Sequence, residues 1–463
     1  MDRLRPRRSV VFRPQAEAVE GRLLLSTVPQ VNPANAQKPF LRPFSVSLKS
    51  PNTPISPFQA SSKLVTFVDP SAKLVKAGHV LAGYKNYLGP YALLDASTGM
   101  IKIGSGSNIQ ANANILSNPT GRRGPTTSVL IGSNVSIGFG ATVSGPSTIG
   151  AFPNTSKPTI IGPNAVIDGA TVQPGAVVSA LAKVEPGVTV PTGVRVLPGV
   201  DVTSNAEASD PALGKVVTLT AGELTKASQT ISIHQSLAQG YATLYQGNSA
   251  TGNFGAGGIT STPLASGVFQ GNLTTITGAG PEPGSATVSF EPSSGSPTFA
   301  APMGQQAQSL LYNFPARVTG QVNFYDKASD VAANLGIHDA ILGDQGQPIN
   351  IGPITRIGNG VTITSPLGST TGPITSGTSS PISIGQGLIA GDHAVILGAQ
   401  GVKVVIEDNV TIGSSAVVEG SSIGANSTIG ARAYVLNSNL PAGSSVRDGA
   451  IVINNKQVGT VAS

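Results

Sequence analysis

A period of six residues runs through the middle of the chain. In the segment TIIGPNAVIDGATVQPGAVVSALAKVEPGVTVPTGVRVLPGVDVTS, an aliphatic residue recurs at every sixth place: Ile160, Val166, Val172, Val178, Val184, Val190, Val196 and Val202. A strand repeats its side-chain direction every two residues and an α-helix about every 3.6, so neither element alone produces this period. Each unit of six predicts one short strand and a turn. Three units predict one coil of a three-sided β-helix with the periodic aliphatic side chain inside.

Small residues occupy other places in the same units, and they predict where the chain bends. Ala165, Ala170, Ala176 and Ala182 fit tight corners, and glycine and proline between them set the turns. This pattern is typical of the hexapeptide repeat of left-handed β-helices. The sequence therefore predicts an all-β fold.

The repeat occurs twice, over about 66–204 and again over about 313–456. In the second array the predicted inward positions are Ile406, Ile412, Val418, Ile423, Ile429, Val435, Leu440, Val446 and Val452. Steps of five between coils indicate one-residue deletions at a corner. Because the arrays end on similar segments, VPTGVRVLPGVDV and LPAGSSVRDGAIV, we interpret them as an internal duplication.

One helix is predicted after the first array. Thr220 and Glu223 form a capping box. A single apolar helical face is formed by Leu224, Ala227, Ile231, His234, Ala238 and Tyr241. We expect this helix to lie along the outside of the coil. The predicted organisation is a basic, Pro/Ser-rich segment at 1–60, a first β-helix with its helix at 61–245, a Gly/Ser/Thr-rich linker at 246–300 and a second, more divergent β-helix at 301–463.

Composition and charge narrow the classes of function. The 463 residues include 57 glycines and 35 prolines, no cysteine and only 11% charged residues, which suits tightly wound β structure and excludes disulfides and thiolate metal sites. Half of the net charge of +6 falls within the first 22 residues, and the rest of the chain has no basic stripe with aromatics. Nucleic-acid binding is therefore not expected. No apolar run is long enough to predict a membrane span.

The N-terminus contains the segment VEGRLLLS after an arginine-rich start. This segment resembles a motif on planctomycete bacterial proteins thought to be exported. The resemblance implies a protein of the cell envelope or exterior. A disordered basic tail on a cytoplasmic protein is the alternative.

The first array resembles a γ-class carbonic anhydrase over most of its length. The segments FVDPSA, IGSGSNIQ and VTVPTGVRVLPGVDVTSNAEA are similar to the family's first coil, its G-x-x-S-N-[IV]-Q segment and its coil exit. IGSNVSIGFGATVSGP is similar, without a gap, to the zinc loop I-G-N-N-V-S-x-x-H-x-x-x-V-H-G-P. The second array resembles the family more weakly, through AILGDQGQPINIG.

The resemblance implies a trimer in which three histidines hold Zn²⁺ between subunits and leave one position open for water. Such a zinc ion lowers the pKa of the bound water to about 7 and so makes hydroxide for attack on CO₂. No ligand position is histidine in this chain. The positions fall on Leu116, Phe139 and Ser144 in the first array and on Thr364, Asp392 and Leu397 in the second. Leucine and phenylalanine have no atom that ligates zinc, and neutral hydroxyls replace imidazole poorly.

Other positions that the resemblance implies are also changed. The family's arginine, which pairs with an aspartate across the subunit contact, falls on Asp95 and Leu342, and the aspartate falls on Ala111 and Asn359. Joint loss of both partners is nearly neutral, whereas loss of one is costly. The acidic proton-shuttle position falls on Gln345, and Gln110 keeps the family's glutamine.

Other sites have weaker signals. The four histidines, His79, His234, His338 and His393, are scattered without metal-binding spacing. His234 is expected to be half-buried on its helix, and His79 and His338 at the surface, whereas a shift of one residue would bring His393 to the ligand position of Asp392. The GRRG turn at 121–124 is either an anion site or a solvated loop.

Two classes of function follow from the sequence. The first is a non-catalytic tandem scaffold with a structural or binding role and no cofactor, whose ligand the sequence does not identify. The second is a zinc-dependent carbonic anhydrase with a reassigned metal site. A hexapeptide acyltransferase, which relies on one histidine beside an acyl-CoA cleft, is a further alternative.

Overall fold

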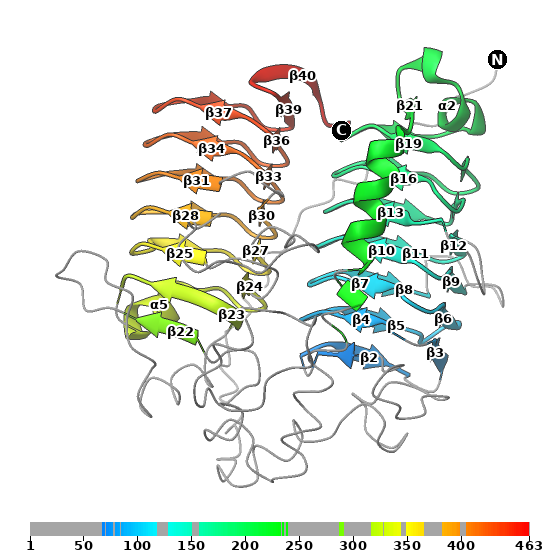
Figure 1. The fold of residues 1–463 in the computed structure, drawn as a ribbon, viewed down its shortest axis with the longest axis horizontal. Coiled ribbons are helices and arrows are strands. Elements are labelled where there is room, and N and C mark those ends of the chain that lie inside the picture. Colours follow the sequence, from blue (N-terminus) through cyan, green and yellow to red (C-terminus); the bar gives the residue numbers. More distant parts are fainter. Residues whose placement is uncertain are drawn as a thin grey trace, which may run out of the picture.

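The computed structural model describes residues 67–69, 71–76, 79–83, 85–117, 128–150, 157–232, 234, 235, 238, 287–290, 316–326, 328–343, 349–364, 382–398 and 404–462. Two upright β-helical stacks, the first and second arrays, stand side by side (Figure 1). Both run from their N-terminal coils at the bottom of the view to their C-terminal coils at the top. The architecture of tandem left-handed parallel β-helices predicted from the six-residue period is confirmed.

Three sheets form the first array, parallel except for β21, and each coil contributes one strand to each sheet. The β1–β21 sheet contains β1 (Phe67–Val68), β4 (Tyr87–Leu88), β7 (Asn108–Ile109), β10 (Val135–Ile137), β13 (Thr159–Ile161), β16 (Val177–Val178), β19 (Val194–Val196) and β21 (Val216–Thr218). The β2–β20 sheet contains β2 (Lys73–Val75), β5 (Leu93–Asp95), β8 (Asn114–Leu116), β11 (Thr142–Ser144), β14 (Val166–Asp168), β17 (Lys183–Val184) and β20 (Asp201–Val202). The β3–β18 sheet contains β3 (Val80–Ala82), β6 (Ile101–Ile103), β9 (Val129–Ile131), β12 (Ser147–Ile149), β15 (Thr171–Val172) and β18 (Thr189–Val190).

The second array repeats this plan. Its β24–β39 face contains β24 (Ala340–Gly343), β27 (Thr362–Thr364), β30 (Val395–Leu397), β33 (Val417–Glu419), β36 (Tyr434–Leu436) and β39 (Ala450–Ile453). Its β25–β37 face contains β25 (Ile349–Ile351), β28 (Ile382–Ile384), β31 (Val404–Ile406), β34 (Ser422–Ile423) and β37 (Asn439–Leu440). Its β26–β38 sheet contains β26 (Arg356–Ile357), β29 (Ile389–Ala390), β32 (Thr411–Ile412), β35 (Thr428–Ile429) and β38 (Ser445–Val446).

A longer strand, β23 (Arg317–Phe324), begins the second array and joins two of its faces. Its first half pairs with β24 and its second half with β25, so both faces belong to one continuous sheet. The same strand pairs with β22 (Thr287–Phe290), which falls within the predicted linker, and the short helix α5 (Ala328–Asn334) follows it. The predicted segment 1–60 and the rest of the linker lie outside the described residues.

The interior of each array is a column of aliphatic side chains. From Val172 onward the predicted inward positions of the first array are buried. Ile160 and Val166 are a correction, because they are half-buried on the outside while Ile161 and Ile167 fill the core. In both pairs two aliphatic side chains are adjacent and face opposite ways. The register with the next coil, which places Ile161 beside Val178 and Ile167 beside Val184, decides which one faces inward.

Corners between strands need residues that tolerate a left-handed backbone or a close approach. Asn112 and Asn164 adopt φ values of 59° and 52° at such corners, and asparagine accepts this conformation more readily than most residues. At Gly162 an added Cβ would lie only 2.6 Å from the backbone nitrogen of Ala180 in the next coil. The tight stacking of coils therefore explains part of the glycine content.

The upper ends of the arrays are covered by irregular elements. In the first array β21 turns back antiparallel to β19, and α2 (Asn205–Ser209) and the 3₁₀ helix η2 (Pro211–Leu213) precede it. In the second array β40 (Lys456–Thr460) turns back antiparallel to β39. These additions pair strand edges that would otherwise remain open to association.

The predicted helix begins at residue 221 and lies along the first array (green, Figure 1). The capping box is confirmed: the Glu223 backbone N–H donates to Thr220 Oγ1, and the Thr220 N–H donates to a Glu223 carboxylate oxygen at 2.8 Å. Ala227, Ile231 and His234 are buried on the face toward the coil. No described helix is long and apolar enough to cross a membrane.

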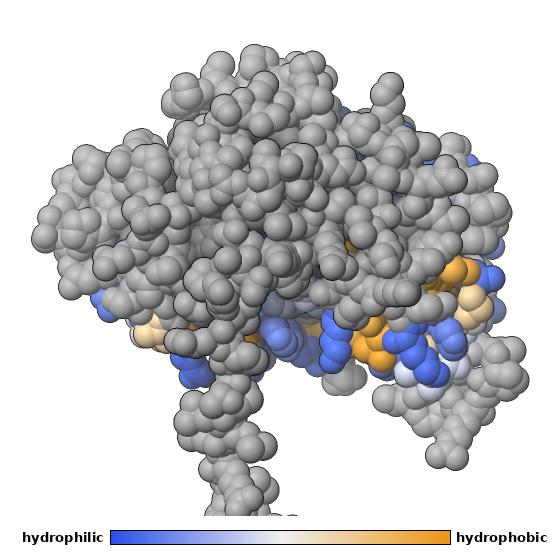
Figure 2. All heavy atoms as spheres, turned by 90° about the horizontal axis from the view of Figure 1, so that it is seen from below, coloured by the Kyte–Doolittle hydropathy of each residue, from blue (hydrophilic) through white to orange (hydrophobic). Residues whose placement is uncertain are grey.

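The two arrays meet along a seam of corners. Asn112 Nδ2 donates to the Gly360 carbonyl at 3.2 Å, and Asn164 Nδ2 donates to the carbonyls of His393 and Ser415. Near the top, the Ala462 N–H donates to the carbonyl of Gly199 at 2.7 Å, so the segment that follows β40 is bonded to the first array. In the view from below, hydrophilic residues (blue) interleave with apolar ones (orange) among the described residues (Figure 2).

Candidate functional site

An apolar cluster lies between the arrays and defines their contact. The inter-array cluster consists of buried residues from the corners of the first array and the β24–β39 face of the second: Ala111, Phe139, Ala180, Ala340, Leu342, Val395, Leu397, Val417, Tyr434 and Ile451. It is separate from the two aliphatic columns inside the arrays. The contact therefore excludes water as a core does, and burial of these side chains favours association of the arrays.

Half of the six expected zinc-ligand positions come together at this contact. Phe139 follows β10 in the first array and lies in the same cluster as Leu397 of the second. Leu397 is paired in register with Thr364, which is also buried. The two arrays thus contribute a phenyl ring, an isobutyl group and a neutral hydroxyl. These side chains do not fit a zinc ion, whose protein ligands are imidazole, thiolate and carboxylate.

The other three positions are separated from this set. Leu116 and Ser144 pair in register on the outer side of the β2–β20 sheet, next to Asp95. Asp392 is exposed at a corner of the second array, where its carboxylate accepts the N–H of Asn359 at 2.8 Å. Among the described residues, no group of three or more His, Cys, Asp and Glu side chains is arranged to hold a metal ion.

Two of the four positions of the expected arginine–aspartate pair are filled by apolar residues, whereas Asp95 is half-buried and Asn359 is exposed. Leu342 and Ala111 come from opposite arrays and both lie in the inter-array cluster. Gln110 belongs to a buried polar group in which its amide donates to Ser136 Oγ at 3.1 Å. Gln345 and the GRRG turn lie outside the described residues.

A different buried ion pair joins the arrays, and it was not predicted from the sequence. Arg317 at the start of β23 donates from Nε and Nη2 to Asp69 Oδ2, with distances of 3.2 and 3.1 Å. Each side chain is 3% exposed. The other Asp69 oxygen accepts the N–H and the hydroxyl of Ser71. The only signal in the sequence was an isolated arginine between apolar residues at the beginning of the second repeat.

The four histidines do not converge. His234 is 1% exposed, more deeply buried than expected. Its Nδ1 lies 2.8 Å from the Thr230 carbonyl, and burial lowers its pKa to about 4. His79 is exposed, as expected. His338 is also exposed, but its ring packs against Tyr91 of the first array at a centroid distance of 4.9 Å.

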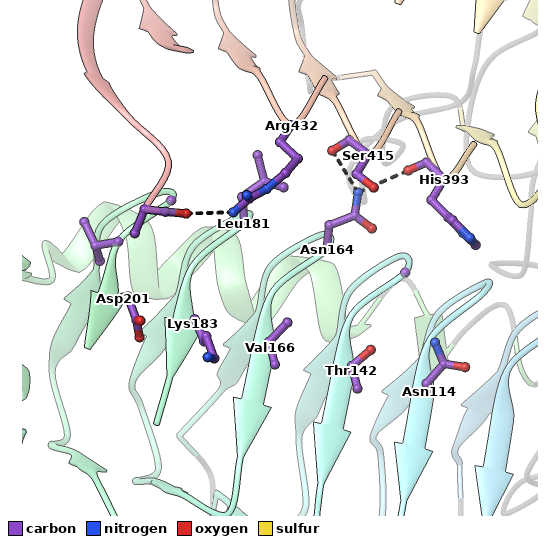
Figure 3. Close-up of a pocket in the computed structure, with 14 residues that line it drawn as sticks. Asn114, Thr142, Asn164, Val166, Leu181, Lys183, Asp201, His393, Ser415 and Arg432 are labelled. Carbon is purple, nitrogen blue, oxygen red and sulfur yellow. Dashed lines mark hydrogen bonds between the residues drawn. The ribbon is translucent and has the colours of Figure 1, made fainter. Parts of the chain in front are cut away.

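His393 lies beside a groove between the arrays (Figure 3). The groove has a volume of about 480 Å³, and its floor is the outer row of the β2–β20 sheet, formed by Asn114, Thr142, Val166, Lys183 and Asp201. Its polar groups are largely engaged. Arg432 donates to the Ala462 carbonyl at 2.7 Å, and Lys183 pairs with Glu185. This groove serves the contact between the arrays.

A larger cavity of about 880 Å³, here named the inter-array cavity, lies on the other side of the contact. Its first wall is formed by the β1–β21 sheet and the helix that begins at residue 221, and its second wall by the β24–β39 face. The charged residues that line it are Arg195, Glu223, Lys226 and Glu419. Volumes of this size are typical of small-molecule sites.

Glu419 is the ionisable group of the second wall. It stands in register with Leu397 one coil below and with Leu436 one coil above, so it occupies the same row as a predicted ligand position. The Tyr434 hydroxyl donates to its Oε2 at 2.8 Å. Burial raises the pKa of Glu419, and burial together with the nearby carboxylate raises the pKa of Tyr434.

Comparison with known proteins identifies the repeat. Residues 403–437 match the family model described as bacterial transferase hexapeptide (six repeats). No curated protein matches the chain.

Solved structures with similarity include a hexapeptide transferase family protein from Anaplasma phagocytophilum, with 19% identity, a TM-score of 0.30, and coverage of 38% of this chain and 88% of that one. A putative acetyltransferase from Bacillus cereus has 17% identity and a TM-score of 0.20, and the match covers 36% of this chain and 83% of that one. A putative acetyltransferase from Desulfovibrio desulfuricans has 10% identity and a TM-score of 0.21, with coverage of 83% and 70%.

Proposed function

We propose that this chain of hexapeptide repeats is a non-catalytic scaffold in which two γ-carbonic-anhydrase-like arrays form a rigid binding module. The first array and the second make, within one chain, the contact that the resemblance assigns to neighbouring subunits. The proposed role is structural or binding, without a zinc-dependent reaction.

The observation that carries this proposal is the packing of Phe139 against the second array. In the family that the sequence resembles, ligands from two subunits meet at the corresponding place. Here Phe139 and Leu397 meet in one buried apolar cluster. Apolar side chains that exclude water from a contact stabilise it and supply no ligand for a metal-bound hydroxide.

A carbonic anhydrase with a reassigned metal site is the alternative from the sequence. It requires at least three imidazole or carboxylate groups around one centre. The described histidines do not supply them, since His234 is buried in its helix contact and His338 and His393 stand at separate corners of the second array. No described side-chain arrangement favours acyl transfer.

The test is metal analysis and CO₂ hydration on the same purified full-length chain, incubated with zinc and then dialysed. We expect less than stoichiometric zinc and no hydration above the uncatalysed rate. A carbonic anhydrase of this family, loaded in parallel, controls for both assays. One zinc per chain together with hydration activity would overturn the proposal.

A further inference from the structure

The inter-array cavity has walls of opposite charge. On the first wall, Arg195 and Glu223 neutralise one another in an ion pair, which leaves Lys226 as the unmatched charge. Lys226 forms no ion pair with any residue that the structure describes. On the second wall Glu419 is the only charged residue among those that line the cavity. One cation and one carboxyl group therefore face the same space from different arrays.

Glu419 has an unused acceptor in this space. Its Oε2 accepts the Tyr434 hydroxyl, whereas no described residue donates to its Oε1. A carboxyl group that is largely removed from water gains most from a donor that carries positive charge. Burial raises the pKa of Glu419 because it destabilises the charged carboxylate, and an ammonium group at this position would offset that destabilisation.

The remaining lining supplies hydrogen-bonding groups and apolar surface. On the second wall, the rim carries Asn437, Asn439 and Asn455, and the helix contributes Gln229 to the first wall. Asn437 and Asn439 are exposed. Amide side chains offer both donors and acceptors, which matches the peptide group.

We propose that the inter-array cavity binds a small zwitterion of the amino-acid or short-peptide class, with its ammonium group at Glu419 and its carboxylate at Lys226. The opposed charges set the orientation of the ligand, and the amide-bearing rim contacts its peptide groups. This inference deepens the binding role of the proposed scaffold and rests on that part of the proposal. It involves no chemical step.

The test is isothermal titration calorimetry of the full chain with triglycine and its two blocked forms. We expect triglycine to bind. N-acetyl-triglycine, which lacks the ammonium group, and triglycinamide, which lacks the carboxylate, should each bind about tenfold more weakly, because each loses one charge-assisted hydrogen bond.

Two variants assign each end of the ligand. Glu419→Gln keeps an oxygen for the Tyr434 hydroxyl, and it should remove the preference for triglycine over its acetylated form. Lys226→Gln should remove the preference over the amide. Glu407→Gln, at an exposed acid outside the cavity lining on the same array, is the matched control and should keep both preferences.

Circular dichroism melting checks that each variant folds. If a variant does not fold, the comparison of the free and blocked peptides on the native chain still tests the inference. No heat of binding up to about 10 mM triglycine, or equal binding of all three peptides, would overturn the inference. Zinc analysis of the same sample reports separately on the scaffold proposal, so the two failures are distinguishable.

Discussion

The Arg317–Asp69 pair makes a quantitative test of the contact between the arrays. Replacing Arg317 by methionine keeps most of the side-chain volume and removes the charge. Among the residues that the structure describes, Asp69 would then keep only the Ser71 N–H and hydroxyl as donors, both to Oδ1. Because both partners are 3% exposed, an unpaired charge here should cost about 3–5 kcal/mol. Asp69→Leu should cost a similar amount, because it removes the carboxylate that pairs with the buried guanidinium.

The double variant distinguishes a buried pair from two separate contacts. With both charges removed, no ion remains without a partner, so the loss should be smaller than the sum of the single losses by about 2 kcal/mol or more. Urea unfolding of the full chain, followed by far-ultraviolet circular dichroism, measures each variant. The half-exposed Lys183–Glu185 pair, treated in the same way, should show coupling below about 1 kcal/mol. Additive losses at Arg317 and Asp69, or single losses under about 1 kcal/mol, would refute the reasoning.

Three further predictions address the core, the helix and the corners. Phe139→Ala should lower the free energy of unfolding in urea by about 3–5 kcal/mol. The control Leu213→Ala, at a side chain 52% exposed, should change it by less than about 0.5 kcal/mol. Equal effects of the two substitutions would contradict the burial of Phe139 at the contact. The folded-state pKa of His234, about 4, lies below its ordinary value, so the contribution of the neutral ring to folding stability is fully present above about pH 6.5 and is lost toward pH 4. About 3 kcal/mol of this acid destabilisation should disappear in His234→Phe. A variant whose stability falls with pH as in the native chain would count against this prediction. Gly162→Ala would place a Cβ 2.6 Å from backbone of the next coil, so it should lower the melting temperature more than Gly187→Ala. At Gly187 the new Cβ meets open space, and the only cost is the strain of a φ of 80°. The reverse order of melting temperatures would show that close stacking is not the constraint.

The interior of the arrays was predictable because it follows from a local rule. From Val172 to Val202 one inward aliphatic residue per short strand gives an unbroken period, and the structure confirms it. The period is ambiguous at Ile160–Ile161 and Val166–Ile167, where the second residue of each pair is also aliphatic and fits if the step to Val172 is five residues. There the choice depends on the register with adjacent coils, which a single strand does not encode. The capping box at Thr220 was predictable for the same reason, since its partners lie within one turn.

The contact between the arrays was not predictable from periodicity. The Arg317–Asp69 pair joins residues that are 248 positions apart, and neither residue has a neighbour in sequence that marks it as a partner. The cavity carboxyl group Glu419 was also missed. It lies in the same row as Leu397, but one coil higher, so a comparison restricted to the family's ligand positions passes over it.

The seam of corners couples the lengths of the two stacks. A solitary β-helix can gain or lose a whole coil and keep its internal pairing, because each coil contacts only its neighbours. In this chain Asn112 and Asn164 each meet a particular coil of the other array. Inserting one coil into one stack between these contacts would shift every later corner by about 4.8 Å and break the match up to Ala462. Within this interval, duplication or deletion of a coil during evolution should therefore be tolerated only when both stacks change together.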